Sequence, residues 1–412
     1  MYRIVDGESV KRSSKAYKNS IDDVISEFNS NGKPTVVYTI DVFFPIVDGV
    51  VNVVDNYAAK LSDNFNVLVV APSFKGRVPA RSYPVLAVKS VYSKALAYEV
   101  PMIDARSKRL IKKLRIDLVH CHSPFFVGRY LLKVAKKRGV PFISTFHSQY
   151  KLDFEKIVGR GGLMRFLMRF IMKPFKQSGE VWTMNEKCVE ILNGYGYEGK
   201  TRIVPHGTAL LPAADYESER AAAREELNVG DKPLFIFVGR LVTQKQILFI
   251  AEVLGELKGM GLDFKMLFVG DGPDRGRLEK KLKEENVSDK VEFAGNVSDR
   301  EKLCSVYAAA DLLLFPSTYD TFALVKVEAA SRNTPAAFGQ GCAAASGVDN
   351  GVNGYIFPLE RKKFAEGVYN AVTDKEGLER TGRNAFRDLY TDWDGIVKTV
   401  ESYYSEIIKN SK

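Results

Sequence analysis

The chain contains 412 residues, which is too long for one ordinary hydrophobic core and fits two domains of about 150–200 residues each. Its 45% hydrophobic and 27% charged residues are typical of globular proteins and exclude disordered, collagen-like and coiled-coil classes. The net charge of +10 is uneven, because residues 1–206 carry +15 and residues 207–412 carry −5. The basic first half predicts an anionic partner, such as a membrane surface, nucleic acid or a phosphorylated acceptor.

The N-terminus and the cysteines bear on the cellular compartment. The sequence contains no run of about 18 uncharged apolar residues, so we expect no membrane-spanning helix. Residues 1–18 show no apolar segment of the kind found in a secretory signal. The four cysteines are scattered singly, which fits a reducing cytosol better than a disulfide framework. We therefore expect a cytoplasmic protein.

In chain order, residues 1–33 are charged and partly helical in pattern, and we interpret them as an N-terminal extension. Strands are expected at Thr35–Ile40, Asn66–Pro72, Leu118–His120, Phe142–Thr145, Val181–Met184 and Arg202–Pro205, and helical stretches separate most of them. Near-continuous apolar runs are typical of parallel strands covered on both faces. This alternation predicts a doubly wound sheet over residues 34–206.

The second half repeats the alternation after a polar connection at 207–231 with a short helix. Strands are expected at Leu234–Val238, Lys265–Val269, Val291–Ala294, Leu312–Pro316 and Thr334–Phe338. Residues 207–387 therefore form a second domain, and a helix at 388–409 ends the chain. Two Rossmann-like domains place a cleft at the carboxyl ends of their strands, where open α/β sheets bind ligands.

A basic loop follows the strand at 234–238. Gly239 stands at the turn, and Arg240 and Lys245 lie five residues apart. Arginine offers a planar fork of donors and lysine a compact charge, which together suit a diphosphate. A solvated basic loop without a ligand is the alternative, and this motif alone leaves both open.

Two further loops follow strands of the same domain. Gly270 and Gly272 come after the strand at 265–269, although they lack the full dinucleotide fingerprint. Asp320 follows the strand at 312–316, and Glu328 lies eight residues later, about two turns into a helix. Carboxylates at these places can accept hydrogen bonds from sugar and ribose hydroxyls. For Asp320, an acidic residue that complements a helix dipole is the alternative.

Four motifs occur in a fixed order: Gly239-Arg240-Leu241 with Lys245, Gly270-Asp271-Gly272-Pro273, Phe293-Ala294-Gly295, and Asp320 with Glu328. In this combination, from about Thr35 to the end, the chain resembles the retaining glycosyltransferases of family 4, which have the GT-B fold. The resemblance implies two Rossmann-like, doubly wound parallel-sheet domains facing a cleft. It also implies a hexosyltransferase that needs no metal ion or other cofactor.

The resemblance implies roles for residues of this sequence. Arg240 and Lys245 would hold the donor diphosphate, Glu328 would bind the ribose, and Asp320 would bind the hydroxyls of the donor sugar. The residues expected to be catalytic are His122, Arg240, Lys245 and Asp320. The further donor-binding residues are Gly49, Gly239, Gly270, Gly272, Val297 along the base, and Thr321, Phe322, Ala323 and Leu324 near the distal phosphate.

The sequence departs from the family pattern at four places of this site. Asp320 replaces the more usual Glu, which shortens its reach. Ala323 stands where Gly is usual, and Gln244 and Gln246 replace a common Glu and a common Gly. The amide of Ala323 is retained, so phosphate binding stays compatible with the sequence, and sugar selectivity is the property that these changes affect.

The first domain supplies the acceptor side. The stretch from Asp41 to Val50 resembles the family's first loop, where a glycine, here Gly49, lets the chain approach the donor phosphate closely. Asp48 stands where a second Gly or an Asn is often seen. His122 ends a strand, and the resemblance implies that its backbone carbonyl borders the anomeric carbon. A metal site is the alternative for His120 and His122, but no ligand set with zinc spacing accompanies them. His147, after the next strand, either lines the same cleft or is a core or capping histidine.

The stretch from Lys156 to Lys176 combines large apolar residues with regularly spaced cations. Arg165, Arg169 and Lys173 recur every four residues and form one stripe of a helix. This pattern predicts an interfacial helix with a basic rim on an anionic membrane and an apolar face in the lipid. The alternative is a domain helix that covers the sheet with its arginines exposed. Nucleic acid is a poor competitor as partner, because no known reader motif appears.

These observations predict a retaining glycosyltransferase. It would move a sugar from a UDP- or GDP-linked donor to an acceptor, expected to be a membrane lipid at the cytoplasmic face, as in bacterial enzymes that glycosylate diacylglycerol or phosphatidylinositol. The same chemistry on a soluble acceptor is one alternative. A non-catalytic nucleotide-sugar-binding or scaffold subunit is the other.

Overall fold

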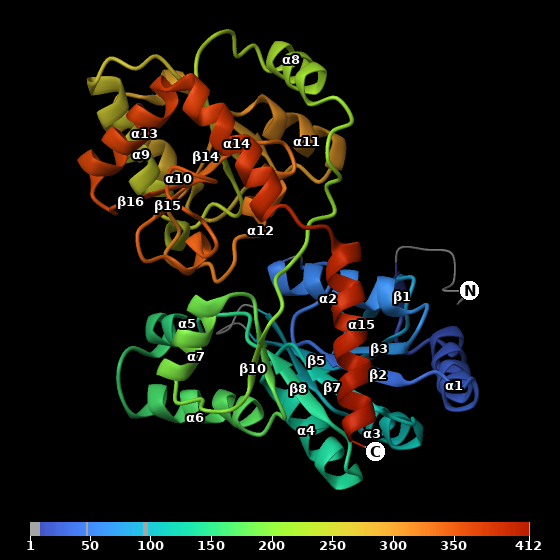
Figure 1. Cartoon of the computed structure of the whole chain (residues 1–412). Coiled ribbons are helices and arrows are strands. Elements are labelled where there is room, and N and C mark those ends of the chain that lie inside the picture. Colours follow the sequence, from blue (N-terminus) through green and yellow to red (C-terminus); the bar gives the residue numbers. More distant parts are fainter. Residues whose placement is uncertain (1–8, 47, 94–97, 412) are drawn as a thin grey trace. The chain divides into compact units, whose positions relative to one another are not determined.

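The structure, a computed structural model of the chain, describes residues 9–46, 48–93 and 98–411. The chain folds into two compact units (Figure 1). Unit 1 comprises the residues up to Pro205 together with those from Asp394 onward, and unit 2 comprises His206–Trp393. The change of unit lies between Pro205 and His206, one residue before the predicted domain boundary.

Unit 1 is built on an eight-stranded sheet in the order β10-β9-β8-β7-β2-β3-β5-β6. Its strands are β2 Thr35–Thr39, β3 Asn66–Pro72, β5 Val85–Ser93, β6 Tyr98–Met102, β7 Leu118–Cys121, β8 Phe142–Thr145, β9 Val181–Thr183 and β10 Thr201–Ile203. The central strand β2 is buried throughout, as its apolar run predicts. Neighbouring strands run parallel, except that β6 pairs antiparallel with β5 at the edge, which sequence analysis did not predict.

Helices cover this sheet: α2 Gly49–Leu61, α3 Ala105–Lys113, α4 Phe126–Arg138, α5 Tyr150–Val158, α6 Gly162–Lys176 and α7 Glu186–Gly194. The C-terminal helix α15, Trp393–Asn410, runs along the same sheet (Figure 1). The hydroxyl of Tyr404 on α15 lies 2.6 Å from Nδ1 of His120 and 3.0 Å from the hydroxyl of Tyr38, and its ring stacks on Trp182. These buried polar and aromatic contacts fix α15 on three strands of unit 1.

The N-terminal segment is an integral part of unit 1, which corrects its interpretation as an extension. Helix α1, Lys15–Ser30, buries Ile21, Val24, Ile25 and Phe28 against the core that also contains residues of α3. Strand β1, Ser9–Lys11, pairs antiparallel with β4, Arg77–Pro79. The helical pattern is confirmed, and its apolar face needs the domain because the isolated helix could not bury it. Residues 1–8 of the predicted extension lie outside the described residues.

Unit 2 contains a six-stranded, fully parallel sheet in the order β13-β12-β11-β14-β15-β16. The strands are β11 Leu234–Val238, β12 Lys265–Val269, β13 Val291–Gly295, β14 Leu312–Phe315, β15 Ala336–Gly339 and β16 Tyr355–Phe357. The helices are α8 Tyr216–Glu226, α9 Ile247–Gly259, α10 Arg275–Glu284, α11 Arg300–Ala309, α12 Leu324–Ala330, α13 Arg361–Thr373 and α14 Lys375–Leu389. All five strands predicted for this half are present.

The predicted terminal helix at 388–409 is wrong at its start. Helix α14 ends at Leu389, and α15 begins only at Trp393. The residues between them run alongside the start of unit 2, because the Thr208 amide donates to the Thr391 carbonyl at 2.9 Å. Gly207 permits this approach, since a Cβ there would lie 2.6 Å from the Asp392 backbone. The segment between α14 and α15 therefore pairs with residues 183 positions earlier in the chain and is not helical.

Candidate active site

The loops of unit 2 that carry the predicted donor residues lie where the strand order reverses. The order runs from β13 to β11 and then from β14 to β16, so the switch lies between β11 and β14. Open α/β sheets bind ligands at the carboxyl ends of strands at such a point. Gly239 follows β11, Gly270 follows β12, and Asp320 lies in the loop after β14. The fold thus gathers these three loops at one edge of the sheet.

The glycines of these loops are explained by backbone packing. A Cβ on Gly270 would lie 2.1 Å from the Gly239 carbonyl oxygen, and one on Gly272 would lie 2.3 Å from the Leu241 carbonyl oxygen. Gly270 also has φ +124°, which residues with a side chain rarely adopt. Gly239, with φ +143°, has the Lys245 side chain as its nearest contact. Gly270 and Gly272 are therefore required by the chain itself, and their presence alone does not indicate a ligand.

Lys245 and Asp320 form an ion pair across the strand switch. Lys245 ends the short 3₁₀ helix η1, Thr243–Lys245, and its Nζ lies 2.6 Å from Oδ1 of Asp320. The two side chains are only 17% and 21% exposed. Oδ2 of Asp320 accepts a hydrogen bond from the Ser317 hydroxyl at 2.6 Å, and the Lys245 ammonium lies 5.0 Å from the centre of the Phe315 ring. Two predicted catalytic residues thus lie in direct contact.

Arg240, on the same loop as Lys245, is exposed. Within the described parts of the chain its guanidinium forms no ion pair. A cation without a protein counter-charge remains available to an anionic ligand. The loop therefore carries one paired and one unpaired cation.

Both departures from glycine keep a left-handed backbone. Ala323 has φ +58° at the start of α12, and Gln246 has φ +61° at the start of α9. A residue with a Cβ pays about 1–2 kcal/mol in this region, so the loops hold these positions against a local preference. Of the neighbouring predicted residues, Thr321 is buried, Phe322 packs its ring 5.3 Å from that of His206, and Leu324 begins α12.

Glu328, on α12, accepts a hydrogen bond from the hydroxyl of Tyr307 at 2.7 Å. Burial raises the pKa of the Glu328 carboxyl, and the Tyr307 hydrogen bond opposes that shift. A carboxylate with one donor has capacity for further donors such as ribose hydroxyls. Val297, which follows β13, packs partly buried against the core of unit 2.

In unit 1, Asp48 and Gly49 stand at the start of α2. Asp48 caps the helix, because its Oδ1 accepts the Val51 amide hydrogen at 2.8 Å. This gives Asp48 a structural reason for its place in the family's glycine-rich loop. A Cβ on Gly49 would meet nothing within 4 Å. The described chain does not itself require glycine there, and the position is open to an approaching ligand.

The predicted residues His122 and His147 are brought together. Nδ1 of His122 lies 2.9 Å from Nε2 of His147, and both side chains are buried. His120 is also buried, and its Nε2 lies 2.7 Å from the hydroxyl of Thr145. Burial holds the pKa of His120 well below its usual value. His120 is therefore a neutral core histidine that joins β7 to β8 and α15.

Helix α6 contains most of the basic stretch from Lys156 to Lys176, and its burial shows which side of the helix faces solvent. Its apolar residues Met164, Ile171, Met172 and Phe175 are buried within unit 1, so the prediction that its main apolar face lies free for lipid is wrong. The interior of the unit occupies that face. The predicted membrane-surface residues Arg165, Arg169 and Lys173 are exposed. Large apolar side chains stay exposed beside them: Ile157 at 59%, Leu163 at 55% and Phe166 at 62%.

Sequence reasoning assigned no role to two buried polar residues, Lys326 in unit 2 and Asp41 in unit 1. Lys326, on α12, donates from Nζ to the carbonyls of Ala344 and Ser346, at 3.0 and 2.6 Å, and so ties α12 to the loop after β15. Burial raises the pKa of Asp41, which follows β2, to about 7. The available signal for Lys326 was a lysine within the apolar run Leu324–Val327, and for Asp41 it was its place directly after a buried strand, at the start of the first loop.

The described residues contain no group of three or more His, Cys, Asp or Glu side chains arranged to hold a metal ion. Among the helices in the described part of the chain, none is long and apolar enough to cross a membrane.

Known proteins match both units. The model of the family "Glycosyltransferase Family 4" matches residues 47–210, and that of "Glycosyl transferases group 1" matches residues 219–388. An alpha-monoglucosyldiacylglycerol synthase of Acholeplasma laidlawii is 26% identical over 90% of this chain and 97% of its own length. An alpha-D-kanosaminyltransferase of Streptomyces kanamyceticus is 30% identical over 75% of this chain and 83% of its own length.

A solved structure supports the fold. Sucrose-phosphate synthase from Thermosynechococcus elongatus superposes with a TM-score of 0.74 at 18% identity, over 92% of this chain and all of that one. Both halves of the chain thus match glycosyltransferase models, and each half has the Rossmann-like sheet of the GT-B fold. The chain belongs to the family 4 glycosyltransferases and is a GT-B enzyme that uses a nucleotide sugar.

Proposed function

We propose that this enzyme transfers a sugar, with retention of configuration, from a UDP- or GDP-linked donor to a membrane lipid at the cytoplasmic face. The observation that carries the donor half of the proposal is the loop with Arg240 and Lys245 at the strand switch of unit 2, next to the carboxylate of Asp320. Two cations and a carboxylate there match the diphosphate and the sugar hydroxyls of one ligand.

The cations act on the leaving group in this proposal. As the bond to the sugar breaks, negative charge grows on the departing diphosphate, and donors fixed in advance stabilise that charge in the transition state. Lys245 is pre-positioned by Asp320 and Phe315, so it loses little freedom when the donor binds. The exposed Arg240 supplies a second positive charge, and we propose that no metal ion is needed.

The stereochemical part rests on family resemblance and on the absence of an assigned nucleophile. In the proposed reaction the acceptor hydroxyl attacks the face from which the diphosphate leaves, the sugar–phosphate bond breaks, and a phosphate oxygen takes the hydroxyl proton. We propose that the backbone carbonyl of His122 borders the anomeric carbon. The open space at Gly49 is compatible with a nearby donor phosphate.

The lipid acceptor is supported by the surface of α5 and α6. Exposed Ile157, Leu163 and Phe166 occur with Arg165, Arg169 and Lys173, a combination that suits shallow insertion among anionic headgroups. The Acholeplasma laidlawii relative is named for a diacylglycerol product. The Streptomyces kanamyceticus relative is named for kanosaminyl transfer, which supports a soluble acceptor as the second candidate.

The deciding experiment is a panel of UDP- and GDP-sugars, monitored for released nucleotide with diacylglycerol vesicles or soluble acceptors present, with and without a chelator. Turnover that requires vesicles supports the proposal, and turnover with soluble acceptors alone supports the second candidate. Nucleotide binding without turnover on any donor refutes catalysis and leaves a scaffold subunit. The anomeric configuration of the product, read by NMR, tests retention.

Membrane binding is tested separately by flotation with anionic vesicles. The variant Arg165→Gln/Arg169→Gln should float less than wild type. Lys398→Gln/Lys409→Gln makes the same change of charge at exposed positions of α15 in the same unit, and should float as wild type does. Equal flotation of both variants would refute the proposal that the α6 surface binds the membrane.

A further inference from the structure

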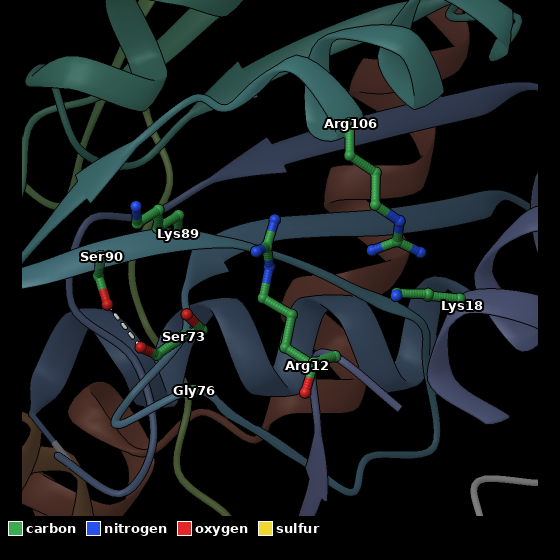
Figure 2. A pocket seen from close by; sticks show the side chains of 8 residues that line it. Arg12, Lys18, Ser73, Gly76, Lys89, Ser90 and Arg106 are labelled. Atoms are coloured by element: carbon green, nitrogen blue, oxygen red, sulfur yellow. Dashed lines mark hydrogen bonds between the residues drawn. The ribbon is translucent and has the colours of Figure 1, made fainter. Parts of the chain in front are cut away.

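A basic cavity lies in unit 1, and none of its lining residues has been assigned a role above. It measures about 370 Å³ and is lined by Arg12, Ser13, Lys18, Ser73, Gly76, Lys89, Ser90 and Arg106. Figure 2 shows the side chains of Arg12, Lys18 and Arg106, which come from three different parts of the fold, turned toward one space, with Lys89 on the neighbouring strand. No carboxylate is among the lining residues.

The N-terminal segment builds this cavity together with the sheet. The Arg12 amide donates to the Gly76 carbonyl at 2.8 Å, and its Nε donates to the Ala87 carbonyl on β5 at 2.6 Å. Tyr17, one residue before Lys18, is buried, and its hydroxyl accepts the Ala87 amide hydrogen at 2.8 Å. These contacts place Arg12 and Lys18 at the same cavity as Lys89 of β5 and Arg106 at the start of α3.

Three of the four cations that line the cavity have no carboxylate partner among the described residues. Arg12 pairs with Asp104. Lys18, Lys89 and Arg106 form no ion pair within the residues that the structure describes. The guanidinium of Arg106 lies over the ring of Tyr17, with its carbon 5.3 Å from the ring centre, and its Nη2 is buried without a hydrogen-bond partner. Like charges gathered in one concavity repel one another, and a buried donor without a partner costs free energy. A bound anion would remove both costs.

We propose that this cavity is a binding site for a phosphate group. Three unbalanced cations match a phosphate ester better than a single carboxylate, because a phosphate offers more acceptor oxygens and up to two negative charges. The serine hydroxyls of the rim add neutral donors, and the volume leaves room for a further group on the ligand. The site is distinct from Arg240 and Lys245, which belong to unit 2, and does not depend on the function proposed for them.

The phosphate can belong to a lipid headgroup or to a soluble compound, and the test separates these sources. The full chain is used with Arg240→Ala/Lys245→Ala, so that the proposed donor site does not contribute. Into this background the pocket variant Lys18→Gln/Lys89→Gln or the control Lys398→Gln/Lys409→Gln is introduced. All four lysines are exposed, so both pairs should keep the fold, as checked by thermal melting.

Calorimetric titration with inorganic phosphate is the first arm. We expect saturable binding that weakens about tenfold in the pocket variant, since two charge-assisted contacts are lost, and is unchanged in the control. Flotation with phosphatidylcholine vesicles with and without phosphatidic acid is the second arm. Loss of phosphatidic-acid-dependent flotation in the pocket variant alone assigns the site to a lipid headgroup, whether or not free phosphate binds.

Weaker phosphate binding with unchanged flotation assigns the site to a soluble phosphate compound. If the pocket variant and the control behave alike in both arms, or if the parent binds neither phosphate nor phosphatidic acid, the proposal is overturned. Arg106→Gln is a second variant that leaves both lysines unchanged. It should reproduce the effect of the pocket variant.

Discussion

Replacing Lys245 by Met tests the role of the ion pair at the strand switch. Methionine keeps an unbranched apolar side chain against Phe315 but removes the charge that lies 2.6 Å from Asp320. Exposed ion pairs contribute about 0–1 kcal/mol, and removing one partner of a buried pair costs about 3–5 kcal/mol. With side chains 17% and 21% exposed and Ser317 still donating to Asp320, we expect a loss of about 1–2 kcal/mol between these limits.

This loss should be visible but should not unfold the protein. One kcal/mol lowers the Tm of a domain of this size by about 2–4 °C, so the Tm of unit 2 should fall by about 2–8 °C. The effect on turnover should be much larger. Loss of one pre-positioned donor to a developing negative charge typically lowers kcat by about 100- to 1000-fold, and the affinity for free UDP or GDP should fall as well.

Two variants separate this reasoning from a purely structural role. Asp320→Asn breaks the same pair but leaves the Lys245 charge in place, so it should lower turnover while keeping the affinity for the free nucleotide. Lys362→Met makes the same substitution at an exposed position of α13 and should change neither. Turnover of Lys245→Met close to wild type would refute the assignment, and equal loss of nucleotide affinity in Asp320→Asn would show that the pair acts only by holding the loops.

Further predictions concern the glycines, Glu328 and the α6 surface. Gly270→Ala places a Cβ 2.1 Å from a carbonyl oxygen and should cost about 3 kcal/mol or more, whereas Gly276→Ala, in open space on α10, should stabilise by about 0.5–1 kcal/mol; denaturant unfolding that ranks them the other way would contradict the packing argument. Because the pKa of Glu328 is raised in the folded state, the native state binds its proton more tightly and loses stability as pH rises from about 4.5 through that raised value. Glu328→Gln should therefore have a higher Tm than wild type at pH 8 and lose that advantage near pH 4. Its nucleotide affinity should fall. A difference in Tm that does not change with pH would contradict the raised pKa of Glu328. Leu163→Ser/Phe166→Ser should reduce flotation with anionic vesicles without lowering the Tm, since both side chains are more than half exposed; unchanged flotation would remove the apolar part of the α6 surface.

The sequence alone determined the alternating fold and the loops on which we expect the donor site. Runs such as Leu234–Val238 and Leu312–Phe315 are apolar without interruption, because strands covered on both faces leave no polar side, and this signal is local. The carboxyl end of a parallel strand is a predictable place for a ligand loop. Arg240, Lys245, Asp320 and Glu328 could therefore be selected from motif order and spacing before any contact was known.

The tertiary structure alone decided which of these residues touch and which faces are free. The pair of Lys245 and Asp320 joins residues 75 positions apart, and no local pattern encodes such a contact. Position 270 requires glycine because the backbone of a second loop lies too close for any side chain. Helix α6 has an amphipathic pattern that suits a membrane and a domain equally, and only the sheet beneath it shows that the domain takes most of the apolar face. The cavity between Lys18, Lys89 and Arg106 likewise exists only because α1 packs onto unit 1. Local periodicity reports how each segment buries its own apolar side chains, whereas sites arise from long-range contacts between segments, which only the folded chain brings together.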